Sequence, residues 1–196
     1  ADEMIRAVQL LVEGGGIEKL RITGGEPLLS GKFDEVMLGI MGLNLSDVAL
    51  TTNGQLLDRK ADVIKESGLK RINISLDTLD ADRFRSIARS GDLASVLKGI
   101  DLMLEAGLKV KINMVPMRTV NIDQVLPMLE WSMERGIELR FIELMNMGHL
   151  KRNSVYQRDF VGMDDLLSMI GAKYKYARID ADYDSTSVRF EILHKG

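Results

Sequence analysis

The sequence predicts an α/β fold in which a parallel sheet forms part of a barrel. Strand-like segments alternate with helical segments at intervals of about 25 to 35 residues, which is typical of strand–helix–strand units. Three of the strands carry charge on one face, whereas a parallel sheet covered by helices on both faces reads as nearly continuous apolar sequence. A barrel with a polar, ligand-binding interior explains this pattern better than a doubly wound sheet does.

Apolar residues at helical spacing and glycines at segment ends define the elements of the first half. Gly14, Gly15 and Gly16 end the first helix, and Gly68 caps a later one. In order, the predicted elements are a helix around 4–12, a strand over 19–23, a helix over 33–41, a strand over 47–51 and a helix over 58–67.

The second half continues the alternation up to residue 148. Asp80 is the expected N-cap of a helical segment. Pro127 is expected as the first residue of its helix, because proline is tolerated where the backbone N–H has no helical partner. The predicted elements are a strand over 70–75, helices after Asp80 and over 93–104, a strand over 108–115, a helix from Leu126 to Gly136 and a strand over 137–142.

The pattern changes beyond Gly148, so we expect a barrel core over 1–148 and a C-terminal extension over 149–196. The extension is expected to hold an exposed loop at 149–158, a short helix at 164–170 and strands at 174–179 and 186–193. Because the chain opens on a helix, we expect the first strand of the barrel to be missing.

Alternation along three strands places polar residues together on one face. Strand 137–142 is apolar throughout and provides no evidence either way. The polar faces carry Lys19, Arg21 and Thr23 on the first strand, Arg71, Asn73, Ser75 and Asp77 on the third, and Lys109, Lys111 and Asn113 on the fourth.

The composition excludes several classes of protein. With 45% apolar and 28% charged residues the chain can bury a core, and its net charge of −3 argues against bulk electrostatic binding of nucleic acid. No apolar run is long enough to span a membrane, and the first residues do not resemble a signal peptide, so we expect a cytoplasmic protein. The absence of cysteine excludes disulfides and any cysteine-ligated metal held by this chain alone.

Cationic side chains on the polar face indicate an anionic ligand. Arg21, Lys111 and Arg71 are expected to converge inside the barrel, where they would suit a nucleoside triphosphate. The alternative is that they pair with Glu26, Asp77 and Glu143. Two adjacent glycines after the first strand let a ligand approach the backbone, although turns use such pairs as well.

Five motifs, taken together, closely resemble the GTP 3',8-cyclase family of radical S-adenosylmethionine (SAM) enzymes. The resemblance covers roughly residues 1–150. Gly-Gly-Glu-Pro alone marks only the superfamily, whereas RINISLDTLD and LRFIELM together are specific to this family. The motifs are LTTNG at 50–54, VKIN at 110–113, RITGGEPLL at 21–29, RINISLDTLD at 71–80 and LRFIELM at 139–145.

The resemblance implies a fold, two sets of ligand residues and a reaction. The fold is a (β/α)6-type barrel, and Glu26 could bind the ammonium group of SAM. The implied SAM-binding residues are Gly25, Ser75 and Met145, and the implied GTP-binding residues are Arg21, Thr51 and Lys111.

In the implied reaction, a [4Fe-4S] cluster cleaves SAM reductively, and the resulting radical abstracts hydrogen from C3' of GTP. The sugar radical then closes onto C8, giving (8S)-3',8-cyclo-7,8-dihydroguanosine 5'-triphosphate, the first step of molybdenum cofactor biosynthesis. A reductant protein is an implied partner, and a homodimer is possible. The family holds the cluster with cysteines in a Cys-x3-Cys-x2-Cys loop, and this chain has none.

The resemblance also implies a cysteine-rich C-terminal part that holds a second cluster, which this sequence does not include. We therefore expect an internal core segment that lacks both cysteine-rich ends, including the first strand and the cluster loop, and is inactive alone. One alternative is a cluster-free module that binds nucleotide or SAM, and another is a different radical SAM enzyme. A barrel lyase or aldolase for phosphorylated sugars, with Lys111 as its Schiff-base lysine, is a weaker alternative.

Overall fold

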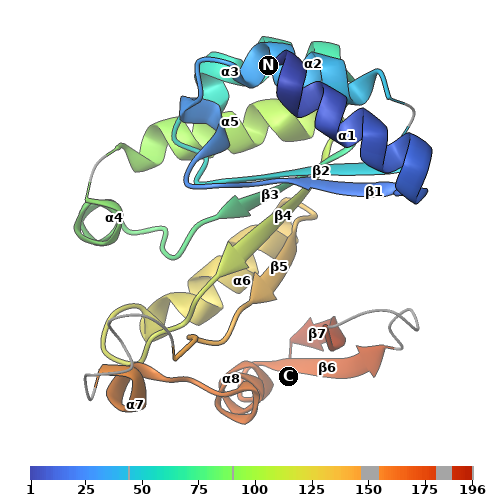
Figure 1. Cartoon of the computed structure of the whole chain (residues 1–196). Helices are drawn as coiled ribbons and strands as arrows, with labels where there is room; N and C mark the ends of the chain where they lie inside the picture. Colours follow the sequence, from blue (N-terminus) through green and yellow to red (C-terminus); the bar gives the residue numbers. More distant parts are fainter. Residues whose placement is uncertain (44, 90, 147–154, 180–186, 196) are drawn as a thin grey trace. The chain divides into compact units, whose positions relative to one another are not determined.

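The structure, a computed structural model of the whole chain, describes residues 1–43, 45–89, 91–146, 155–179 and 187–195 (Figure 1). It divides into two compact units. The first comprises Ala1–Met114 with Met128–Ile142, and the second comprises Val115–Pro127 with Glu143–Gly196. The first unit holds a parallel sheet, and the second holds an antiparallel strand pair.

The sheet of the first unit confirms the predicted α/β class. Its strands are β1 (Lys19–Ile22), β2 (Asp47–Thr52), β3 (Arg71–Ser75), β4 (Lys109–Met114) and β5 (Glu138–Phe141). All pair in parallel, and their spatial order is β1-β2-β3-β4-β5, the same as their order in the chain. A doubly wound sheet reverses its order at a switch point, whereas a barrel segment does not. The sheet is thus part of a barrel.

Helices cover one face of this sheet. Figure 1 shows α1, α2, α3 and α5 together on one side of β1, β2 and β3. Fully buried Leu50, Ile72 and Ile112 of the strands and Ile64 and Ile100 of the helices form the core between these layers. The helical elements are α1 (Asp2–Gly15), η1 (Pro27–Leu29), α2 (Phe33–Met41), α3 (Leu57–Ser67), α4 (Ala81–Ala88), α5 (Leu93–Glu105) and α6 (Val125–Glu134).

Two predicted helix ends are confirmed. Gly68 ends α3 in the left-handed region, with φ of 74°, where glycine has no Cβ penalty. The Asp80 carboxylate accepts a hydrogen bond of 2.7 Å from the backbone N–H of Arg83 and so caps α4.

The predicted place of Pro127 as the first residue of its helix is wrong. A short 3-10 turn, η2 (Ile122–Gln124), precedes α6, and the helix starts at Val125, which makes Pro127 its third residue. The position still lies in the first turn, where backbone N–H groups have no partner within the helix, so proline is tolerated.

The second unit contains η2, α7 (Val155–Asp159), α8 (Met163–Gly171), β6 (Tyr174–Ile179) and β7 (Arg189–Lys195). The predicted loop at 149–158 is wrong at its end, because 155–158 belong to α7; residues 149–154 lie outside the described part of the chain. Hydrogen bonds from Thr119 and Arg158 hold the buried carboxylate of Asp159, which anchors this helix. None of the described helices is long and apolar enough to cross a membrane.

Candidate functional site

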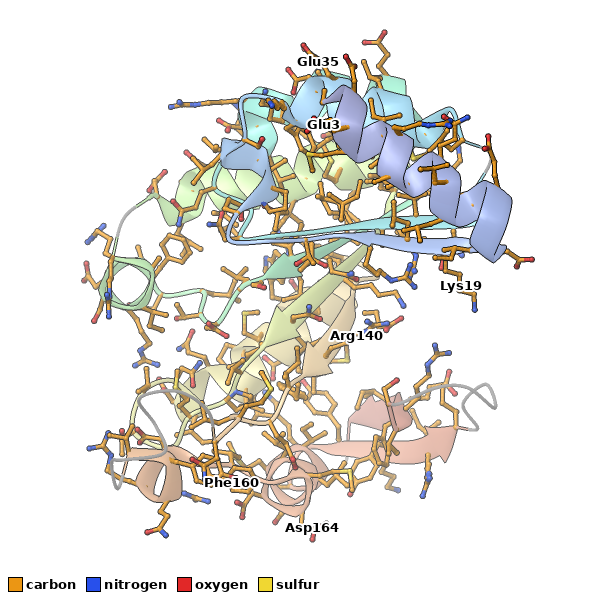
Figure 2. All side chains as sticks on the ribbon, viewed as in Figure 1. Glu3, Lys19, Glu35, Arg140, Phe160 and Asp164 are labelled. Atoms are coloured by element: carbon orange, nitrogen blue, oxygen red, sulfur yellow. The ribbon has the colours of Figure 1, made fainter. Side chains whose placement is uncertain are left out.

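Strand alternation puts polar side chains on the sheet face opposite the helix layer. Figure 2 shows Lys19 and Arg140 extending from the side of the sheet away from α1 and α2. The register places Thr51 beside Asn73, Asn73 beside Lys111, and Lys111 beside Glu138, so one polar row crosses four strands. The polar faces predicted for the first and fourth strands are confirmed by their alternating burial.

The first charged cluster on this face joins two arginines to one carboxylate. Arg71 donates two hydrogen bonds of 2.6 Å to Asp47, and Arg21 donates one of 3.1 Å to the same carboxylate. Burial raises the pKa of Asp47, but the hydrogen bonds and charges of Arg71 and Arg21 outweigh it and hold that pKa below its ordinary value. Asp47 therefore stays ionised and the cluster carries one net positive charge.

The second charged cluster also contains two cations and one carboxylate, and it lies on the adjoining strands β4 and β5. Lys111 Nζ lies 2.8 Å from Glu138 Oε2, and Arg140 Nε donates a 2.7 Å hydrogen bond to Glu138 Oε1. Burial raises the pKa of Glu138, while the hydrogen bonds from Lys111 and Arg140 lower it to below the ordinary value. This cluster also carries one net positive charge.

The carboxylates that pair with these cations correct two expectations. Strand 137–142 was expected to give no evidence about the polar face, but Glu138 and Arg140 of this strand both lie on it. The carboxylates that pair Arg21, Arg71 and Lys111 are Asp47 and Glu138, whereas the sequence suggested Glu26, Asp77 and Glu143 as partners. Sequence reasoning missed Glu138 and Arg140, although their spacing of two was the signal.

Among the described residues, two buried acceptors on this face have no hydrogen-bond partner. They are the Oδ1 atoms of Asn73 and Asn113. Asn73 is 7% exposed, and its Nδ2 donates a 3.3 Å hydrogen bond to Thr51 Oγ1. Buried polar groups are usually paired, so each unpaired acceptor needs an explanation.

Glu26, in the loop after β1, is held by hydrogen bonds from within the chain. Its carboxylate accepts hydrogen bonds from the Thr52 hydroxyl at 2.6 Å, from the backbone N–H of Asn53 at 2.7 Å and from that of Leu28 at 3.1 Å. Glu26 also lines a cavity of about 300 Å³, to which none of the six expected ligand residues contributes.

Gly25, beside Glu26, is exposed and has no positive φ. A Cβ added there would meet no other atom within 4 Å. Neither the backbone conformation nor packing against the described residues therefore requires glycine at this position.

The structure brings five of the six expected ligand residues into the first unit. Arg21, Thr51 and Lys111 share the polar face, and Ser75 ends β3 on the same face, beside Asn113 in the register. Gly25 lies in the loop after β1. Met145 belongs to the second unit, where its side chain is 58% exposed.

The residues present do not fit an iron–sulfur cluster. The chain contains no cysteine, and the part that the structure describes holds no group of three or more His, Asp or Glu side chains that could bind a metal ion. Thiolate is the usual ligand of such clusters.

Comparisons with known proteins place these features in context. A family model for the radical SAM superfamily matches residues 1–132. The chain is 38% identical over 183 residues to the GTP 3',8-cyclase of Listeria monocytogenes, covering 92% of this chain and 54% of that protein. It is 35% identical over 175 residues to the GTP 3',8-cyclase of Synechocystis, covering 89% and 53%. The chain thus spans about half the length of these curated relatives.

A solved structure agrees with the fold. The crystal structure of Streptococcus suis SuiB bound to S-adenosylmethionine matches with a TM-score of 0.56 and 23% identity, over 71% of this chain and 32% of that one. At this identity the match supports the fold alone.

Proposed function

The chain belongs to the radical SAM superfamily, and from this premise we propose that it forms the substrate-binding barrel core of a GTP 3',8-cyclase. The motifs quoted above imply that such an enzyme converts GTP to (8S)-3',8-cyclo-7,8-dihydroguanosine 5'-triphosphate. GTP is the proposed substrate and SAM the proposed cofactor.

The observation that carries this proposal is the pair of charged clusters on the polar face. Each contains two cations and one carboxylate, so the face keeps an excess of positive charge although the whole chain has a net charge of −3. A triphosphate would complete the coordination of these cations without requiring either carboxylate to be protonated. Arg21 and Lys111 are the proposed phosphate ligands, and Thr51 adds a hydroxyl.

Gly25 supports a SAM site at the end of β1. A ligand can lie against the backbone at Gly25, because this residue is exposed and has no side chain. We assign this role to the methionyl end of SAM. Ser75 is exposed at the end of β3, where its hydroxyl is accessible to the same cofactor. Met145 is the proposed contact for adenine.

In the proposed reaction, this chain binds and orients GTP and SAM. SAM supplies the radical chemistry when it is bound beside a [4Fe-4S] cluster, and the chain has no thiolate to hold such a cluster. The cations fix the phosphates, and fixed substrates react faster because less entropy is lost on the way to the transition state. We therefore propose that the isolated chain binds both ligands without turnover.

A cluster-free binding module is the second candidate function, and the absence of cysteine favours it. This module would bind GTP or SAM in the same places. The two candidates differ in a full-length protein reconstituted anaerobically with iron and sulfide. Formation of 5'-deoxyadenosine in the presence of GTP supports the cyclase, whereas binding with no such product supports the module.

Calorimetric titration of GTP into the 196-residue chain tests the GTP site. We expect Lys111→Met to weaken GTP binding about 10-fold. The substitution removes a partly buried cation, and the negative charge of Glu138, which Lys111 no longer neutralises, would then repel the phosphates. Lys98→Met is the matched control, because Lys98 is an exposed lysine of α5. Equal GTP affinity in the wild type and Lys111→Met would contradict this assignment.

A pair of glycine substitutions tests the SAM site separately. Gly25→Ala should leave the melting temperature unchanged and weaken SAM binding at least about 10-fold, because a methyl group would occupy the space of the ligand. Gly31→Ala is the control, since Gly31 also has open space and no positive φ. If the two variants bind SAM equally well, Gly25 does not contact the cofactor.

We also propose a reductant protein and a second copy of the chain as partners. Among the described strands, β1 pairs only with β2, which leaves its other edge open to a further strand. Light scattering over a range of protein concentrations tests self-association, and a monomer at every concentration would exclude it.

A further inference from the structure

Asn73 carries a buried acceptor to which no residue in the described part of the chain donates. The residue is 7% exposed on β3, and its Oδ1 has no hydrogen-bond partner within the ranges that the structure describes. Burying an amide oxygen without a partner costs stability, because the oxygen loses its hydrogen bonds to water. A ligand that donates a hydrogen bond would recover this loss.

The surroundings of Asn73 define what such a ligand must offer. Its Nδ2 donates to Thr51 Oγ1 at 3.3 Å, and Thr51 Oγ1 is an acceptor in that bond. The hydroxyl hydrogen of Thr51 is thus available for another acceptor. Together the pair presents one donor, on Thr51, and one acceptor, on Asn73.

Lys111 places this pair next to the proposed phosphate site. It is the register neighbour of Asn73 on β4, and neighbouring strands lie about 4.8 Å apart. Ionised phosphates have no hydrogen to donate, so they cannot satisfy the Asn73 oxygen. The group joined directly to the phosphates of a nucleotide is the ribose, whose hydroxyls both donate and accept.

We propose that the Thr51–Asn73 pair binds a ribose hydroxyl of the nucleotide whose phosphates Lys111 holds. This inference rests on the proposed function, because it requires that a nucleotide binds to the polar face. Asn73 accepts the hydrogen of the hydroxyl, and Thr51 donates to its oxygen. The pair is a determinant of ribonucleotide specificity and holds the sugar in one orientation.

The test compares GTP with 2'-deoxy-GTP and 3'-deoxy-GTP by calorimetric titration into the wild-type chain and Asn73→Leu. We expect the wild type to bind one deoxy analogue about 10-fold more weakly than GTP, because that analogue leaves Asn73 unpaired. Asn73→Leu should bind GTP and that analogue equally. Its melting temperature should change little, because leucine removes the unpaired oxygen, which offsets the loss of the 3.3 Å hydrogen bond to Thr51.

Ser132→Ala is the matched control. Ser132 Oγ is also buried without a partner in the same unit, but it lies on α6. This variant should keep the discrimination of the wild type. Asn73→Ala provides a second replacement at the same position should the leucine variant not fold.

The outcomes separate this inference from the proposed function. If the wild type binds GTP and both deoxy analogues equally, or if discrimination persists in the Asn73 variants, the inference is overturned while the GTP site stands. If the wild type binds no GTP, the proposed function fails and the inference fails with it. Discrimination that disappears only in the Asn73 variants supports both.

Discussion

Asp159 shows how a single residue organises the second unit. Its side chain is buried, yet it stays ionised because the hydrogen bond from Arg158, followed by that from Thr119, lowers the pKa of the carboxyl to about 2. Its backbone carbonyl also accepts a 2.9 Å hydrogen bond from the N–H of Arg118. Helix α7 and the 115–121 segment are therefore joined at this residue.

The lowered pKa of Asp159 predicts a pH-dependent contribution to stability. The ordinary pKa is 3.8 and the folded value is about 2, so the stabilisation is complete above pH 4 and is lost as the pH falls toward 2. We expect Asp159→Asn to lower the free energy of unfolding by about 1 kcal/mol at pH 7, after screening by solvent near Arg158.

Urea unfolding at pH 7 and at pH 2.5 measures this contribution, and the difference between wild type and Asp159→Asn should shrink at the lower pH. Asp164→Asn is the control, because Asp164 is exposed on α8. An unchanged difference at both pH values would show that the charge of Asp159 does not contribute.

At the scale of elements, α3 and α5 pack closely against each other at Gly99. A Cβ placed on Gly99 would lie 2.5 Å from Leu57 Cβ and 3.3 Å from the backbone nitrogen of Asp58. These atoms belong to or adjoin the backbone of α3, so they cannot rotate away. The helix layer over the sheet therefore depends on the absence of a side chain at this position.

Gly99→Ala should destabilise the first unit although alanine favours helix formation. We expect a loss of about 1–3 kcal/mol from overpacking, net of a propensity gain of about 1 kcal/mol. Gly14→Ala in α1 is the matched control, since a Cβ there meets nothing within 4 Å, and it should raise stability slightly. Thermal unfolding compares the two variants, and a Gly99→Ala protein as stable as wild type would refute the close approach.

At the scale of the whole molecule, charge is distributed unevenly. The chain has a net charge of −3, yet both clusters on the polar face carry excess positive charge. Carboxylates elsewhere, such as Glu3 and Glu35 on the helices in Figure 2, offset these cations in the total. The proposed binding of GTP would therefore depend on the local field of the polar face and not on the net charge of the chain.

This distribution predicts that GTP binding weakens as salt is added. Screening shortens the range of charge interactions from about 10 Å at 0.1 M salt to about 3 Å at 1 M. We expect GTP affinity to fall about 10-fold or more over that range, while SAM, which carries little net charge, binds nearly equally. Titrations at several salt concentrations measure both, and a salt-independent affinity for GTP would contradict the phosphate role of the clusters.

Local patterns were enough to predict the succession of the five parallel strands along the chain, the helix ends at Gly68 and Asp80, and the charged faces of two strands. Each depends on residues close together in the chain, whose periodicity or capping chemistry is the same in any fold. The resemblance of the five motifs to the family likewise depends only on the residue types and their order in the sequence. Pro127 was misplaced because a 3-10 turn precedes its helix, which begins at Val125. Helix α7 was missed because its last residue, Asp159, is held by Thr119, which lies 40 residues away in the sequence.

The partners of the cations were beyond the reach of such patterns. Asp47 lies 24 residues from Arg71 in sequence, and Glu138 lies on a different strand from Lys111, so only the strand register brings each pair together. A shift of one residue in that register would turn every such side chain to the other face. The unpaired oxygen of Asn73 is likewise defined only by its neighbours on β2 and β4, because burial and pairing are properties of the assembled sheet.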